Sequence, residues 1–170
     1  MALAVRNATD EDHPFLWQML YQAVYWRSIR DTTNPPFEQG LAAPEVRVAL
    51  DRFGELDGDT AVIATDGSTP VGAAWYRYYR ESKAIRGYID DSTPVLVLAV
   101  AATHRRRGIG SKLVTELAQR AAAQGIDRIS LMVSKDNHAY QLYLSCGFQV
   151  AADVDDSCLM VIGTHDDGSR

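Results

Sequence analysis

Short apolar runs bounded by turn residues divide this chain into predicted strands. Seven such runs are present: Leu3–Asn7, Thr60–Thr65, Val71–Tyr79, Val95–Ala102, Ile126–Val133, Phe148–Asp153 and Ser157–Ile162. Asp66-Gly67-Ser68 is a hairpin-type turn, so the second and third strands should pair antiparallel. The run Val95–Ala102 is almost entirely apolar, which is typical of a central strand that is buried on both faces.

Other segments place apolar residues at helical spacing. The predicted helices run from a cap at Thr9 or Asp10 to Val24, over Pro44–Phe53, from near Lys112 to Gly125, and over Asn137–Ser145. The segment Thr32–Pro44 is rich in Pro, Asn, Thr and Gly, which predicts a loop. The run Val95–Ala102, the helix after it and Ile126–Val133 make a βαβ unit, so a parallel strand pair is expected.

Length and composition favour a single domain in a reducing compartment. With 170 residues and 46% hydrophobic content, the chain can bury a substantial core. We expect a domain over residues 1–164 and a frayed polar tail over 165–170. Its two cysteines, Cys146 and Cys158, have neither metal-ligand spacing nor the density of a secreted disulfide scaffold, so a cytoplasmic setting without a metal is expected.

Charge and hydropathy exclude two classes of partner. The net charge is −5 and the isoelectric point is near 5.3, which argues against a surface devoted to nucleic acid. No apolar run reaches the ~18 residues of a membrane span, and the first residues lack a targeting pattern. We therefore expect neither nucleic acid nor a membrane as a partner.

The segment His104–Ser111 reads His-Arg-Arg-Arg-Gly-Ile-Gly-Ser, between the buried strand and the next helix. Gly108 and Gly110 allow the backbone to approach a ligand closely, and the N–H groups of the first helical turn point at it. Such a loop suits a phosphate or pyrophosphate, and arginine side chains match phosphate oxygens. The segment therefore predicts a site for an anionic cofactor.

Three other interpretations of this loop make different demands on the spacing of its glycines. A dinucleotide-binding fingerprint needs a small residue where this chain has Leu113, and a Walker-type P-loop needs four residues between its glycines, so both fail. A plain strand-to-helix turn with solvated arginines remains open on spacing alone.

Two motifs together resemble the GCN5-related N-acetyltransferase (GNAT) family. The first is Arg105-x-x-Gly108-x-Gly110, which resembles the acetyl-CoA signature of that family. The second is the sequence from Asp136-Asn137 through Tyr143 to Gly147-Phe148, which resembles its closing helix and strand. The resemblance covers the chain up to about Ile162, although residues 31–91 carry no motif of the family. It implies an α/β GNAT acyl-CoA N-acyltransferase fold, with a mixed, mostly antiparallel sheet of six to seven strands, a central parallel splayed pair and about four helices.

The resemblance also implies how acetyl-CoA is held. The pantetheine arm would bond to the backbone of Leu98, Ala99 and Val100, and the N–H of Val100 would stabilise the oxyanion. Asn137 would either contact the pantetheine region or only cap its helix. The remaining predicted cofactor-binding residues form the anion loop: Arg105, Arg106, Arg107, Gly108, Ile109, Gly110 and Ser111.

Tyr143 is the predicted catalytic acid. The resemblance implies that its hydroxyl protonates the departing thiolate, and Tyr143 is counted with the cofactor-binding residues; without the motif, packing against Phe148 would be the plainer interpretation. No carboxylate lies in the central strand, so the general base stays open among Glu81, Asp90, Asp91 and His138.

The acceptor is predicted only by class, as the amine of a small molecule or peptide. Aromatic residues gather on and after the third strand, where they either contact the acceptor or simply pack in the sheet: Trp75, Tyr76, Tyr78, Tyr79 and Tyr88. Charged neighbours could recognise a charged acceptor: Arg77, Arg80, Glu81, Asp90 and Asp91. The sequence thus predicts an N-acetyltransferase that acts by direct attack in a ternary complex, and the resemblance allows a homodimer. A non-catalytic acyl-CoA sensor of the same fold and, with less support, a nucleotide-binding protein are the other interpretations.

Overall fold

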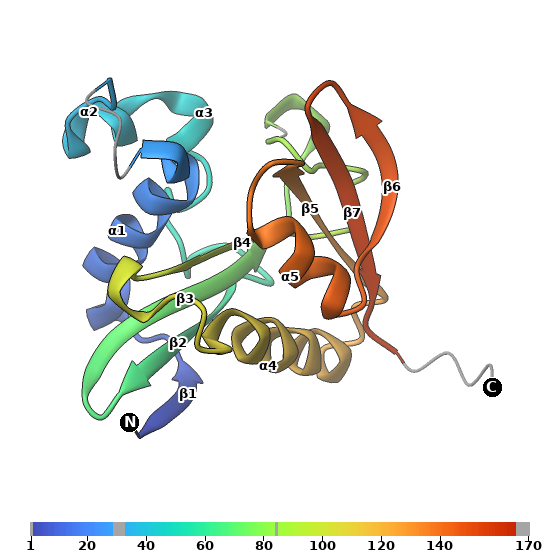
Figure 1. Cartoon of the computed structure of the whole chain (residues 1–170). Coiled ribbons are helices and arrows are strands. Elements are labelled where there is room, and N and C mark those ends of the chain that lie inside the picture. Colours follow the sequence, from blue (N-terminus) through green and yellow to red (C-terminus); the bar gives the residue numbers. More distant parts are fainter. Residues whose placement is uncertain (1, 29–32, 84, 166–170) are drawn as a thin grey trace.

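One seven-stranded sheet runs through the computed structural model, which describes residues 2–28, 33–83 and 85–165 (Figure 1). Its strand order is β1-β2-β3-β4-β5-β7-β6, and every neighbouring pair is antiparallel except β4 and β5, as expected. The strands are β1 (Leu3–Asn7), β2 (Thr60–Asp66), β3 (Thr69–Arg77), β4 (Val95–Val100), β5 (Arg128–Ser134), β6 (Gln149–Val154) and β7 (Ser157–Gly163).

Five α-helices accompany the sheet in the described ranges. They are α1 (His13–Val24), α2 (Phe37–Ala42), α3 (Pro44–Arg47), α4 (Ile109–Ala123) and α5 (Ala139–Ser145). A short 3-10 turn, η2 (Trp26–Ser28), follows α1. In the part of the chain that is described, no helix is both long and apolar enough to span a bilayer. All but His165 of the predicted tail lies outside the described residues.

Helix α2 corrects the expectation of a loop between Thr32 and Pro44. Tyr21 donates a hydrogen bond to the carbonyl of Pro35 at 2.7 Å, and Tyr25 donates one to the carbonyl of Gly40 at 3.0 Å. Leu41 is buried, so the segment also contributes to the core. Packing on α1 thus imposes a helix where local composition favours a loop.

The alternation of side chains along the strands builds two cores. On one face, residues such as Val62, Ala74 and Leu96 pack against α4. On the other face, residues such as Ile63 and Trp75 pack against α1. The two helices cover opposite faces, and Val95, Leu96 and Ala99 of β4 are buried, whereas Val97, Leu98 and Val100 have intermediate exposure.

A buried ion pair explains why α3 ends earlier than predicted. The guanidinium of Arg77 pairs with Asp59 at 2.9 Å and 2.6 Å, and both side chains are almost fully buried. The same guanidinium also donates to the carbonyl oxygens of Val48 at 3.0 Å and Asp51 at 2.8 Å. These carbonyl oxygens therefore accept hydrogen bonds from Arg77 instead of from the N–H groups of a longer helix. The sequence pattern predicted that the helix would continue to Phe53.

The parallel strands β4 and β5 share one registered pair, Val95 with Ser130. The N–H of Ser130 donates to the carbonyl of Pro94 at 3.0 Å at the same level. Beyond that point the two strands diverge, and Figure 1 shows β1–β4 and β5–β7 on either side of the divergence. The sheet is thus continuous at one end of the pair and open at the other.

The turn before α1 contains a carboxylate whose ionisation should affect stability. Asp12 accepts hydrogen bonds from Arg6 at 2.7 Å and 2.8 Å and from the N–H of Thr9 at 2.8 Å. The Arg6 guanidinium, helped by that N–H group, lowers the pKa of Asp12 from 3.8 to about 2. Because the pKa of Asp12 is lowered in the folded state, the stability that its ionised form contributes is fully present above the unfolded-state pKa. It is lost as the pH falls through the folded-state pKa.

We therefore expect Asp12→Asn to remove about 1–2 kcal/mol from the free energy of unfolding at pH 6. The difference from wild type should shrink as the pH falls below the unfolded pKa of Asp12. Urea unfolding of both proteins at several pH values between 6 and 2 measures this. A difference that stays constant over that range would contradict the assignment.

Candidate active site

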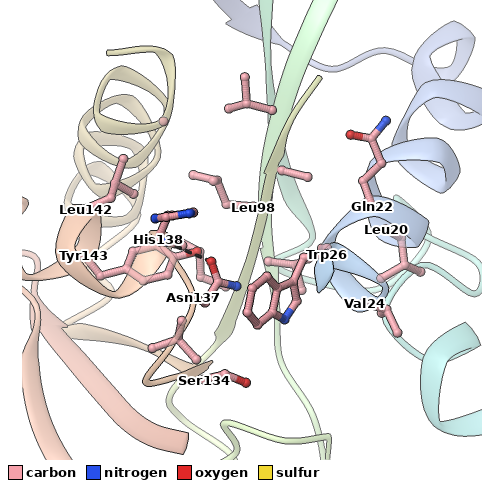
Figure 2. A pocket seen from close by; sticks show the side chains of 18 of the residues that line it. Leu20, Gln22, Val24, Trp26, Leu98, Ser134, Asn137, His138, Leu142 and Tyr143 are labelled. Atoms are coloured by element: carbon pink, nitrogen blue, oxygen red, sulfur yellow. Dashed lines mark hydrogen bonds between the residues drawn. The ribbon is translucent and has the colours of Figure 1, made fainter. Parts of the chain in front are cut away.

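A cavity of about 1270 Å³ opens where β4 and β5 diverge. Its described lining comes from the end of α1 and η2, from α3, from β4, from the loop into α4, from the end of β5 and from α5. Figure 2 shows Leu98 on the central strand, with Gln22 on one side and Tyr143 on the other. Segments far apart in the sequence therefore meet around one space.

The backbone of β4 presents polar groups to this cavity. The N–H of Ala101 donates to the carbonyl of Val71 on β3 at 2.8 Å. Successive N–H groups of an extended strand point to opposite sides, so those of Val100 and Leu98 point away from β3, toward the gap. The N–H of Ala99 points toward β3 instead, so of the three predicted backbone contacts Leu98 and Val100 have the appropriate orientation.

The anion loop adopts a conformation that needs two left-handed residues. Arg106 has φ of 61° and Gly108 has φ of 76°, and α4 begins at the next residue, Ile109. The N–H of Lys112 bonds to the carbonyl of Gly108 at 3.1 Å, so the preceding N–H groups of the helix have no intrahelical acceptor. Ile109, Gly110 and Ser111 all line the cavity.

The two glycines of the loop serve different purposes. Gly108 provides the left-handed conformation, and a Cβ there would have open space around it. A Cβ on Gly110 would lie 2.7 Å from Cδ1 of Leu142, so that glycine lets α4 approach α5 closely. Both glycines line the cavity, so close approach of a ligand to the backbone remains a prediction for each of them.

The three arginines of the loop also differ. Arg105 donates from Nε to the carbonyl of Val100 at 3.0 Å and lies 3.5 Å from the amide oxygen of Gln22 on α1. It therefore ties the loop to the end of β4. Arg106 is exposed and lines the cavity, whereas Arg107 is exposed and is absent from the described lining.

Asn137 and Tyr143 both line the cavity, and both also have the plainer role considered from sequence. The side-chain oxygen of Asn137 accepts a hydrogen bond from the N–H of Ala139, the first residue of α5, at 2.9 Å, which is an Asx-type turn that leads into the helix. The ring of Tyr143 packs edge-on against Phe148, with centroids 5.4 Å apart. Burial raises the pKa of Tyr143 above its ordinary value of 10, so its hydroxyl stays protonated at neutral pH.

The candidates for the general base differ in whether they line the cavity. Asp90 pairs with Arg128 at 2.6 Å, and Asp91 accepts hydrogen bonds from Tyr88 and Arg80. Neither residue, nor Glu81, lines the cavity, whereas His138 does. Glu45 of α3 is the one carboxylate in the described lining, and no motif in the sequence marked it.

Of the two roles considered for the aromatic residues on and after β3, packing in the sheet fits Trp75 and Tyr76. Trp75 is 1% exposed and donates from its indole to the carbonyl of Ala49 at 3.2 Å. Tyr76 is fully buried, and no residue of this cluster lines the cavity. Likewise, Arg77 is taken up by its buried pair with Asp59. The cavity is lined instead by Tyr25 and Trp26, which the sequence analysis did not single out.

Further lining residues come from the segment before β4. Ile85 and Arg86 face the cavity, and Arg86 donates to the hydroxyl of Ser157 at 3.0 Å. Nothing in their local sequence indicates such a role. Among the residues that the structure describes, no group of three or more His, Cys, Asp or Glu is arranged to hold a metal ion.

Comparison with known proteins gives one family and many similar folds. The model of the acetyltransferase (GNAT) family matches residues 26–148. None of the curated protein sequences matches the chain significantly. The PaiA N-acetyltransferase of Thermoplasma acidophilum in complex with coenzyme A is 18% identical, with a TM-score of 0.68 over 96% of this chain and 99% of that one.

Two further solved structures illustrate the range of similar proteins. A phosphinothricin acetyltransferase of Sinorhizobium meliloti in complex with acetyl-CoA is 16% identical, with a TM-score of 0.68 over 96% of this chain and 89% of that one. A ribosomal-protein-alanine N-acetyltransferase of Brucella melitensis is 23% identical, with a TM-score of 0.66 over 94% and 99%. At these identities the likeness concerns the fold alone.

Proposed function

Because the chain belongs to the acetyltransferase (GNAT) family, we propose that it transfers an acetyl group from acetyl-CoA to the amine of a small molecule or peptide. The observation that supports this most is the divergence of β4 and β5 after a single registered pair. It leaves a cavity of about 1270 Å³ beside unpaired strand backbone and the start of α4. An extended thioester arm ending in a pyrophosphate matches such a space.

The proposal places the acyl donor along β4 and the anion loop. N–H groups between Arg106 and Ser111 bind the pyrophosphate, with the guanidinium of Arg106 as an additional donor. The pantetheine arm bonds to the backbone at Leu98 and Val100. Asn137 keeps its Oδ1 as the acceptor for the N–H of Ala139 and donates its side-chain amide hydrogens to the arm. Arg105 acts on the protein itself, because its Nε bonds the carbonyl of Val100.

The chemistry is direct attack of the amine on the thioester. The nitrogen lone pair forms a bond to the carbonyl carbon, and the N–H of Val100 stabilises the oxyanion, an effect worth about 3 kcal/mol in other acyl-transfer enzymes. Collapse of this intermediate breaks the C–S bond, and the thiolate takes the proton of the Tyr143 hydroxyl. The nitrogen releases its surplus proton to water as the amide forms, and Tyr143 regains a proton from solvent.

The amine has to be neutral before it attacks. An alkyl amine with a pKa near 10.4 is protonated at pH 7, so deprotonation costs about 4 kcal/mol. His104, His138 and Glu45 are the side chains of the described lining outside residues 105–111 that can receive this proton directly or through water. Asp90, Asp91 and Glu81 lie outside this lining and are therefore poorly placed to act as the base.

A reduced, cytoplasmic setting completes the proposal. Both cysteines are free, Cys146 at intermediate exposure and Cys158 buried. Reduced thiols are usual in the cytoplasm, whereas secreted proteins tend to pair them.

Thiol release from acetyl-CoA tests the function. The protein is incubated with acetyl-CoA and a panel of polyamines, aminoglycosides, amino acids and peptides with free N-termini. We expect amine-dependent release of free thiol with at least one class. CoA binding without release in any of them would instead support a non-catalytic acyl-CoA sensor.

A further inference from the structure

The part of the cavity beyond the proposed acyl donor is bordered by the end of α1. If acetyl-CoA occupies β4 and the anion loop, an acceptor reaches the acetyl group past the remaining lining residues, which include Tyr25, Trp26, Glu45 and Arg86. Trp26 is the largest of these side chains. Figure 2 shows its indole projecting from the end of α1 into the space between that helix and the α5 side of the cavity.

Arg27 fixes the position of this indole. Its guanidinium carbon lies 4.9 Å from the centroid of the Trp26 ring, which is a cation–π contact. The same guanidinium donates to the carboxylate of Asp136 at 2.9 Å and lies 3.9 Å from that of Asp156. Asp136 follows β5, and Asp156 lies in the turn between β6 and β7. Arg27 therefore joins the end of α1 to the other side of the sheet's divergence.

We refer to Trp26, Arg27, Asp136 and Asp156 as the clasp. Its charged side chains are exposed, with 52% of Arg27, 64% of Asp136 and 76% of Asp156 accessible. Exposed ion pairs contribute little to stability, with measured values of about 0–1 kcal/mol. The contacts of the clasp thus fix a side chain in the cavity without holding the fold together, and they can be removed with the fold intact.

We propose that Trp26 is a specificity-determining residue for the amine acceptor and that Arg27 is its positioning residue, an inference that rests on the acetyl transfer proposed above. The indole narrows the acceptor end of the cavity and favours slim amines over bulky ones. Asp136 and Asp156 hold Arg27 against the outer face of the ring. Loss of either the ring or the guanidinium widens the acceptor end of the cavity, so kcat/KM for bulky amines rises relative to kcat/KM for slim amines.

The chain offers a matched control for Arg27. Arg47 also stacks on a tryptophan, with its guanidinium carbon 5.6 Å from the centroid of Trp17. It is equally exposed at 52%, and it lies 3.8 Å from the carboxylate of Asp51. Arg47 is absent from the described lining of the cavity. Arg47→Ala therefore removes the same type of contact away from the acceptor.

The test compares kcat/KM for the bulkiest and the slimmest amines that wild type acetylates. In Trp26→Ala this ratio should rise about tenfold, the discrimination that one wall of an apolar pocket supplies. Arg27→Ala should shift it in the same direction by about threefold, and Arg27→Lys, which keeps the charge, should lie between Arg27→Ala and wild type. Arg47→Ala should keep the wild-type ratio. The Kd of CoA is measured for every variant, so that a change in donor binding is separated from a change in the choice of acceptor.

Trp26→Phe provides a second variant that keeps an aromatic ring, and its ratio should fall between wild type and Trp26→Ala. Unchanged ratios in both Trp26→Ala and Arg27→Ala would overturn the inference, as would an equal shift in Arg47→Ala. Either result with normal acetylation leaves the proposed function standing. Absence of acetylation by wild type with every amine would instead refute the proposed function, and the acceptor specificity with it.

Discussion

Tyr143→Phe is expected to lower the turnover of acetyl transfer about 100-fold, the lower end of what a positioned general acid contributes. The hydroxyl is the group that protonates the thiolate in the proposed mechanism. Burial raises the pKa of Tyr143 above 10, so the proton is present throughout the neutral range. The ring contact with Phe148, 5.4 Å between centroids, is kept by phenylalanine. Steady-state kinetics with the best amine of the panel measures the change in kcat.

Acetyl-CoA affinity should change little in this variant, since the hydroxyl acts after binding. Tyr140→Phe is the matched control, because Tyr140 lies in the same helix but outside the described lining of the cavity. It should keep wild-type turnover. Equal turnover in Tyr143→Phe and Tyr140→Phe would remove Tyr143 from the mechanism.

Asp59→Ala is expected to destabilise the fold by about 3–5 kcal/mol, because it leaves the guanidinium of Arg77 buried without its counter-charge. Arg77 is 3% and Asp59 1% exposed at their side chains. Asp59 also accepts a hydrogen bond from the N–H of Gly54 at 2.9 Å, which the substitution removes as well. A loss of this size is a large fraction of the 5–15 kcal/mol that typically stabilises a domain. Urea unfolding followed by circular dichroism measures it.

The exposed pair Arg52–Glu55 provides the comparison. Its atoms are 2.8 Å apart, but the side chains are 68% and 58% exposed. Glu55→Ala should cost less than about 1 kcal/mol, since water already solvates both charges. A cost for Asp59→Ala as small as that for Glu55→Ala would contradict the structural role assigned to the buried pair.

The central part of the fold could be predicted from the sequence because local pattern and burial agree there. Three local patterns each match one type of element: the apolar run matches strand β4, the glycines match the turn before α4, and the apolar stripe after them matches α4. The parallel pairing of β4 with β5 followed from that unit. Helix α2 could not be predicted in the same way, because its contacts with α1, including the hydrogen bonds from Tyr21 and Tyr25, form only in the folded chain.

The candidate site shows the same difference between residues in contiguous motifs and residues that only the fold brings together. Its anion loop and α5 carry contiguous motifs, and the structure brings Gly108, Asn137 and Tyr143 to one cavity. The acceptor side has no motif, because Trp26, Glu45 and Arg86 come from separate segments that meet only in three dimensions. The aromatic run on β3 could not decide between the two roles from sequence, because a strand buried on both faces carries large side chains whether or not a ligand is near.

In the proposed reaction the acetyl group passes directly from acetyl-CoA to an amine. Quantifying free CoA, acetylated amine and the intact mass of the enzyme in one reaction tests it most directly. We predict one acetylated amine for each CoA released and an enzyme of unchanged mass, with release that depends on the amine. Release without acetylated amine, a stable acetyl adduct on the enzyme, or bound CoA with no product would contradict this account.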